Sequence, residues 1–149
     1  MKWIMIVAGI LVAMVLIVVI VGYMLPVKHR AMRQASFHAP AAQLYELITN
    51  TDASWRSVTD DAPIEFTERT PNQRVVTRIS DPKLPFGGSW TYELTPSADG
   101  RTTLRITEDG EVYNPVFRFV SRFIMGHTAT IDQYLRDVGR HFNEEPTIA

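Results

Sequence analysis

Two titratable side chains, Glu108 and His127, are placed by the sequence pattern near one apolar surface. Glu108 is in phase with Leu104 and Ile106 along an alternating stretch, so a regular strand directs its carboxylate toward the apolar face. A carboxylate in such a setting needs a partner or takes a raised pKa. His127 lies near the apolar stripe of a helical segment, and an imidazole titrates near neutral pH. An acid–base pair across an internal cavity is therefore the most specific chemical hypothesis.

Both residues also have a purely structural interpretation. Asp109-Gly110 follows Glu108, and a β-bulge that began one residue early would turn the carboxylate outward. An arginine could instead neutralise it. A lone histidine on an apolar face is more often a hydrogen-bonded core residue than a catalytic one. The sequence leaves these alternatives open.

Other reaction chemistries find little support. Cysteine is absent and the histidines show no ligand pair at i, i+4, so no metal site and no cofactor are expected. These histidines are His29, His38, His127 and His141. Ser121, His127 and Asp132 lie in one helical segment without a nucleophile elbow, so a hydrolase triad is not indicated.

Aromatic side chains are the expected lining of a pocket for an apolar ligand. The residues that we expect to line it, with Glu108 and His127, are Trp55, Trp90, Tyr92, Phe119 and Phe123. Ordinary core packing is the alternative for each of them. The loop 81–88 carries Leu84 and Phe86 between prolines and glycines, and it either covers the cavity mouth, dips into a membrane or connects two strands.

The segment Asn114–Phe142 predicts one long helix that positions His127. Its apolar residues recur at steps of three, four or seven and keep one face apolar. Pro115 suits the first turn, and Asn114 can cap it. So wide an apolar face needs a broad partner, for which a curved antiparallel sheet is the natural choice.

The preceding residues supply that sheet. We expect strands at 31–37, around Ile64 and Phe66, at 73–80, at 89–95 and at 101–108, with a turn at Asp99-Gly100 and a break or bulge at 109–110. Pro40 opens a helix with a shared apolar face that stops at Asn50 in a left-handed conformation. A second short helix begins near Asp52 and carries Trp55. This order predicts an α+β domain with a cavity between the sheet and the long helix.

An unbroken run of uncharged, mostly apolar residues extends from Trp3 to Leu25. About 20 such residues span a bilayer, whereas a cleavable signal peptide has a shorter apolar core and a small-residue cleavage site. We therefore expect residues 1–26 to form a retained single-pass anchor and residues 27–149 the folded domain. Lys28, Arg30 and Arg33 outnumber the single Lys2 before the run, which places the domain in the cytoplasm.

The charged residues do not indicate a polyanionic partner. The net charge is −1, with 15 basic and 16 acidic residues spread along the chain and no basic stripe. Binding of nucleic acid is therefore not expected. The sequence does not indicate an oligomeric state.

Several motifs resemble the SRPBCC superfamily, which includes polyketide cyclase/dehydrase-like and START-like lipid-transfer proteins. The C-terminal motifs are 107–110, Asn114-Pro115, Arg118-Phe119, Gly126 and 131–135. Phe37-His-Ala-Pro40, Leu44-Tyr45 and Asp52 with Trp55 are similar to the N-terminal half. The resemblance covers about residues 31 to 143. It implies the helix-grip fold, in which a curved antiparallel sheet grips a long C-terminal helix over a hydrophobic ligand cavity.

Three functions remain open at this point. The first is a membrane-anchored binding protein for a hydrophobic or amphipathic small molecule, such as a lipid or isoprenoid. The second is a polyketide cyclase/dehydrase-like enzyme that uses Glu108 and His127 as acid and base. The third is a scaffold domain whose own side chains fill the cavity.

Overall fold

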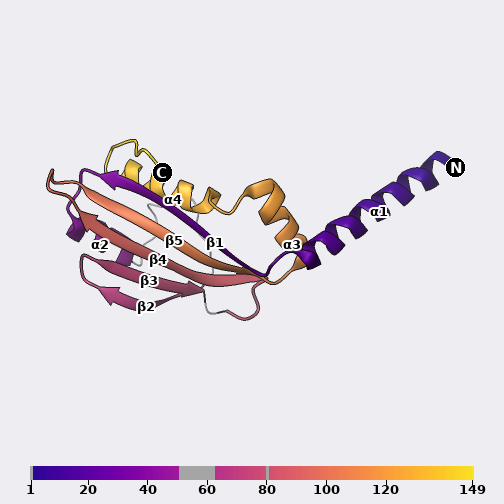
Figure 1. The fold of residues 1–149 in the computed structure, drawn as a ribbon, viewed down its shortest axis with the longest axis horizontal. Coiled ribbons are helices and arrows are strands. Elements are labelled where there is room, and N and C mark those ends of the chain that lie inside the picture. The colour runs from indigo at the N-terminus through magenta and orange to yellow at the C-terminus, as the bar shows by residue number, and fades with distance from the viewer. Residues whose placement is uncertain (1, 51–62, 80) are drawn as a thin grey trace.

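The computed structural model describes residues 2–50, 63–79 and 81–149 (Figure 1). Its strands are β1 (Lys28–Phe37), β2 (Ile64–Thr70), β3 (Arg74–Ile79), β4 (Phe86–Pro96) and β5 (Thr102–Val112). Its helices are α1 (Lys2–Met24), α2 (Ala41–Thr49), α3 (Pro115–Val120), the π-helical η1 (Ser121–Met125) and α4 (Ala129–His141).

The strands form one antiparallel sheet in the order β1-β5-β4-β3-β2. The sheet is curved and does not close, and α4 lies across its concave side (Figure 1). The expected α+β architecture with a sheet around a C-terminal helix is thus confirmed. β1 begins at Lys28, three residues before the predicted strand, and so includes His29.

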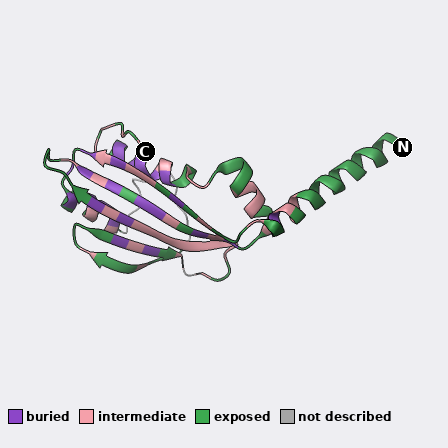
Figure 2. Ribbon diagram, viewed as in Figure 1, coloured by how far each residue is buried: buried purple, intermediate pink, exposed green. Residues whose placement is uncertain are grey.

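The hydrophobic core lies at the end of the sheet away from α1. There α2 and α4 cover the concave face, and the buried residues in Figure 2 concentrate in this region. The expected apolar face of α2 is confirmed, because Ala41, Leu44, Leu47 and Ile48 are its buried residues. The predicted left-handed stop is wrong: Asn50 has φ −65° and ψ 126°, an extended conformation. The short helix expected at 52–55 lies outside the described residues.

The single long helix predicted for 114–142 is wrong. The segment is divided into α3, η1 and α4, and Gly126 separates the last two with φ 77° and ψ 152°. The two halves pack on different partners, since α4 buries Ile131 and Leu135 against the sheet whereas α3 packs on α1. One straight helix cannot pack on both the sheet and α1, and Gly126 permits the change of direction. The start is as expected, because Asn114 Oδ1 accepts hydrogen bonds from the first turn of α3.

The bulge expected at Asp109-Gly110 is also wrong. β5 continues to Val112, and its register with both β1 and β4 is unbroken along its length. Regular alternation therefore holds, and Glu108 stays on the same face as Leu104 and Ile106. That face is the concave one.

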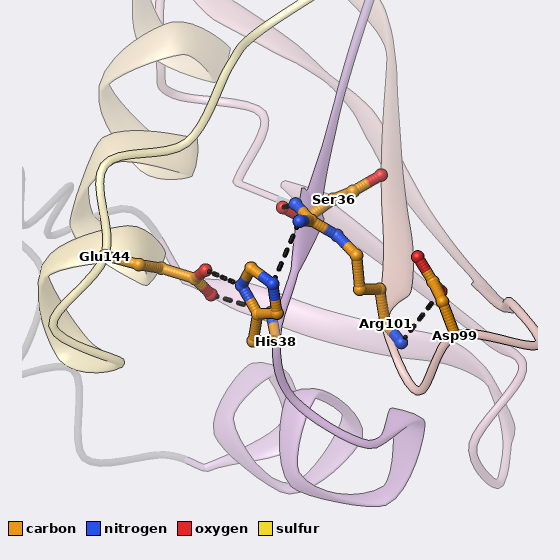
Figure 3. Close-up of polar contacts among 5 residues, drawn as sticks. All are labelled: Ser36, His38, Asp99, Arg101 and Glu144. Atoms are coloured by element: carbon orange, nitrogen blue, oxygen red, sulfur yellow. Dashed lines mark hydrogen bonds and ion pairs between the residues drawn. The ribbon is translucent and has the colours of Figure 1, made fainter.

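The C-terminal residues pack at the end of the sheet away from α1, which we call the closed end because the hydrophobic core fills it. Ala149 exchanges two backbone hydrogen bonds of 2.9 Å with Gln34, so the tail runs along the free edge of β1. Figure 3 shows His38 between Glu144 and Arg101. Its Nδ1 lies 2.9 Å from Glu144 Oε2, and its Nε2 lies 3.0 Å from Arg101 Nη1. Because arginine can only donate, Nε2 accepts from Arg101 and Nδ1 donates to Glu144.

α1 projects away from the domain and is exposed along nearly its whole length (Figure 2). It is long and apolar enough to cross a membrane, by criteria that signal sequences also meet. Its last turns pack on α3. Gly22 is buried there, and a Cβ at this position would overlap the carbonyl group of Pro115 in α3.

Candidate functional site

A cavity of about 570 Å³ lies between the concave face of the sheet and the α3–η1–α4 segment. Residues of all five strands line one side, residues between Phe117 and Asp137 line the other, and Ile48 and Asn50 contribute from the end of α2. Its lining is mostly apolar and aromatic and includes Ile48, Ile64, Phe66, Ile79, Phe86, Trp90, Tyr92, Val112, Phe117, Met125 and Tyr134.

An aromatic group forms the part of the cavity wall next to the core. The rings of Trp90 and Tyr92 lie 5.9 and 5.5 Å from the ring of Tyr134, measured between centroids. Trp90 and Tyr92 come from β4, and Tyr134 comes from α4. Such tilted and edge-on contacts hold the rings in fixed positions.

A polar cluster lies at the other end of the cavity, toward α1. We call Glu108, His29, His127 and Ser121 the polar cluster, and all four line the cavity. Glu108 Oε1 lies 3.5 Å from His29 Nε2. The rings of His29 and His127 stack with centroids 4.1 Å apart, and His127 Nδ1 lies 3.2 Å from Ser121 Oγ. Three separate elements, β1, β5 and the α3–α4 segment, thus meet in one row of polar groups.

Gly110 makes room for this cluster. It is the partner of His29 in the β1–β5 register, and a Cβ on Gly110 would overlap the imidazole ring of His29. The missing side chain therefore lets the ring lie flat over β5. Gly110, from which a break in the strand was predicted, instead leaves space for the His29 ring.

Both histidines of the cluster favour the neutral form. Burial lowers the pKa of His29, and the nearby His127 lowers it further. Burial also lowers the pKa of His127, with a smaller contribution from the Arg122 charge. At neutral pH each ring therefore offers one N–H donor and one acceptor, a suitable set for orienting the polar group of a ligand.

The sequence hypothesis of a Glu108–His127 pair takes a different form in the structure. Both side chains line the cavity, but His29 lies between them, in contact with the carboxylate on one side and stacked on His127 on the other. The arrangement can move a proton between ring nitrogens and a bound polar group, and it can hold such a group by hydrogen bonds.

The other expected lining residues divide into three groups. Trp90 and Tyr92 line the cavity. Phe119 and Phe123 do not: their rings contact each other at 4.9 Å, and Phe123 is 60% exposed. The change of helix direction places Phe117 and Met125 at the cavity instead. Trp55 lies outside the described residues.

His29 is the site residue that sequence reasoning missed. The strand was expected to begin at Ala31, and His29 was considered only as a metal ligand. Alternation with Ala31, Ala35 and Phe37 is the signal that places it on the concave face. Within the part of the chain that the structure describes, no group of three or more His, Asp or Glu side chains could hold a metal ion.

Comparison with solved structures places this architecture. A conserved protein from Geobacillus kaustophilus matches with a TM-score of 0.63 at 12% identity, over 80% of this chain and 99% of that chain. A START superfamily protein from Mycobacterium smegmatis matches with a TM-score of 0.59 at 11% identity, over 77% and 97%. The chain has a START-like helix-grip fold. A Thermobifida fusca protein gives a TM-score of 0.54 at 16% identity, over 80% and 96%.

These likenesses concern the fold. No protein-family model and no curated protein sequence matches the chain. The function must therefore be argued from the cavity itself.

Proposed function

We propose that this protein is a membrane-anchored binding protein for an amphipathic small molecule of lipid or isoprenoid type. The observation that carries the proposal is the cavity of about 570 Å³, whose lining is mostly aromatic and aliphatic and includes the polar cluster at the end toward α1. Ligand pockets generally have this combination of an apolar lining and a few placed polar groups. A START-like fold supports the same assignment.

The apolar part of the cavity supplies affinity. Burial of roughly 300 Å² of apolar ligand surface would contribute about 7 kcal/mol before the costs of association and ordering. The aromatic group around Tyr134 is already packed in place, so little ordering is needed on the protein side. Micromolar affinity for a chain of moderate length is the expected result.

The anchor would bring the cavity to its ligands. The polar cluster lies at the end of the domain where α3 packs on α1, so a bilayer around α1 would lie next to the polar end. The basic residues that follow α1, Lys28, Arg30 and Arg33, favour a cytoplasmic domain. In this arrangement a lipid-soluble molecule reaches the cavity without crossing much water.

A cavity-filling substitution tests the binding proposal. Both Ala129 and Thr130 are exposed, but Thr130 lines the cavity and Ala129 does not. Thr130→Trp should therefore reduce uptake of an octyl-chain ligand at least tenfold while the domain stays folded. Uptake is measured by isothermal titration calorimetry of the full chain in maltoside micelles. Ala129→Trp is the matched control and should bind as the wild type does. Equal uptake by both variants would show that the ligand does not enter this cavity.

An acid–base enzyme is the second candidate. The contact between Glu108 and His29, with His127 stacked behind, favours it because a carboxylate and two neutral imidazoles face one bound molecule. It requires a bell-shaped pH profile of turnover and loss of turnover, with binding retained, in Glu108→Gln. A scaffold with a filled core is less well supported, since the side chains of the described residues leave the cavity unfilled.

A further inference from the structure

A second, smaller pocket lies where α1 joins the domain. Its volume is about 300 Å³. It is lined by Leu25, Pro26, Val27, Lys28, His29, Arg30, Val112, Arg118, Ser121, Arg122 and His127. His29, Val112, Ser121 and His127 line the larger cavity as well, so the two spaces share one wall. The shared wall contains most of the polar cluster.

The lining of the small pocket is strongly basic. Lys28, Arg30, Arg118 and Arg122 contribute four positive charges, and none of the described residues that line it is acidic. Two of these charges are partly balanced nearby: Lys28 lies 3.6 Å from Glu111, and Arg30 lies 3.6 Å from Asp109.

The two arginines from the α3–η1 segment differ in this respect. Among the described residues, neither Arg118 nor Arg122 forms an ion pair with a carboxylate. The smaller pocket therefore carries uncompensated positive charge on its α3 side.

Arg118 is held in place by neutral groups. Its Nη1 donates to the carbonyl of Leu25 at 2.9 Å, and its Nη2 donates to the carbonyl of Tyr113 at 3.1 Å. Its Nε is buried and has no hydrogen-bond partner. A buried donor on a cation without an anion is costly, so the site is prepared for a negatively charged group. Carbonyl contacts fix the guanidinium without neutralising it.

We propose that this pocket binds a phosphate group carried by the amphiphile whose apolar part occupies the larger cavity. The inference rests on the proposed binding function and specifies its ligand class. Arginine recognises phosphate oxygens through paired N–H groups, and two arginines suit a group with several charged oxygens. The neutral rings of His29 and His127 can add donors from the shared wall.

The place of the pocket agrees with this ligand. Leu25 directly follows α1, so a bilayer around α1 brings the pocket to the level of the lipid headgroups. The phosphate of a membrane amphiphile lies at that level, and basic residues beside a membrane helix favour anionic headgroups. The larger cavity continues from the shared wall into the domain, where an alkyl chain would lie.

Paired ligands that differ only in the head test the proposal. The full chain in maltoside micelles is titrated with octyl phosphate and with octanol by isothermal titration calorimetry. Wild-type protein should bind octyl phosphate at least tenfold more tightly than octanol. Arg122→Gln should reduce that preference severalfold with little effect on octanol, because Arg122 is exposed and its loss leaves the fold intact. Arg136→Gln on α4, which lines neither pocket, is the charge-matched control and should keep the preference.

Each alternative outcome has a definite meaning. Equal affinity for the two ligands, or an unchanged preference in Arg122→Gln, would overturn the phosphate site while leaving the cavity proposal standing. Inorganic phosphate that binds as tightly as octyl phosphate would overturn the amphiphile as its source. Failure of both octyl ligands to bind would overturn the proposed function itself. Because Arg118→Gln loses contacts to Leu25 and Tyr113, Arg118→Lys is the second variant and should lower the preference while keeping the charge.

Discussion

The two ends of β1 carry histidines in opposite settings. His38 follows the strand at the closed end of the sheet, where its exposed ring bridges Glu144 and Arg101 (Figure 3). His29 lies at the end next to α1, half-buried over Gly110 and facing a cavity. The first histidine fastens the C-terminal tail, whereas the second is available to a ligand. One strand therefore joins the packed region of the domain to the region that contains the cavity.

The difference arises from side-chain size along the concave face. Toward α1, β5 presents Leu104, Ile106, Glu108 and then Gly110. β4 changes in the same direction, from Leu94 through Tyr92 and Trp90 to Gly88. Side-chain volume is lost at Gly110 and Gly88, which follow the large Tyr92 and Trp90 rings, so the concave face is filled at one end and hollow near these glycines. Binding sites can be built this way because the closed end supplies most of the folding free energy.

The largest expected effect is at the closed end. Leu104 is fully buried in the core, and Leu104→Ala should lower the free energy of unfolding by about 3 kcal/mol through lost burial and the remaining cavity. Urea unfolding followed by tryptophan fluorescence measures this change. Thr130→Ser, at the hollow end, should cost far less. A similar loss in both variants would contradict the division of the sheet into two regions.

A smaller effect is expected where the two regions meet in the polar cluster. Gly110→Ala introduces a methyl group into the space of the His29 ring, so the ring must move into the cavity. The expected destabilisation is about 1–2 kcal/mol, with a several-fold loss of octyl-ligand affinity. Gly100→Ala lies at the Ser97–Arg101 turn, with open space around the added carbon but a positive φ of 80°. It should destabilise the domain without changing ligand affinity, and calorimetry separates the two outcomes.

The smallest effect is a pH dependence that belongs to the hollow end. The native pKa values of His29 and His127 are lowered by burial and neighbouring charge, so between those values and about 6.5 the unfolded chain binds more protons than the native one. The contribution of these rings to the free energy of unfolding is therefore complete above about pH 6.5 and is lost as the pH falls through their native pKa values.

Unfolding measured between pH 5 and 8 checks this sign. Wild-type protein should lose stability on acidification, and a His29→Gln, His127→Gln double variant should lose less. An equal slope in both proteins would assign the acid sensitivity to other groups.

The sequence predicted the elements better than their junctions. Alternation located the strands, and the apolar face of α2 was correct because both signals depend on neighbours close in the chain. The break at Gly126 was missed because the helical period continues across it, and only the contact between α3 and α1 requires a turn. A bulge was predicted at Gly110 because the sequence does not show whether a glycine is needed for an irregular backbone or to leave room for a neighbouring side chain.

The candidate site was predicted in part for the same reason. Glu108, Trp90 and Tyr92 follow from alternation along single strands, and all three line the cavity. His29 joins them only through the pairing of β1 with β5, a contact between distant parts of the chain. Phe117 and Met125 replaced Phe119 and Phe123 because the helix turns at η1, which the periodicity did not show.

The connection between α1 and β1 determines how far the domain can travel. Only Leu25, Pro26 and Val27 separate the two elements, a span of roughly 10 Å at full extension. Arg118 holds the carbonyl of Leu25, Val112 N–H holds that of Val27, and Gly22 packs against Pro115. If α1 spans a membrane, this short and hydrogen-bonded linker holds the domain at a fixed height and orientation relative to the bilayer. Under the proposed function, a protein anchored in this way would not carry a ligand to a facing membrane and would transfer it at the surface of its own bilayer.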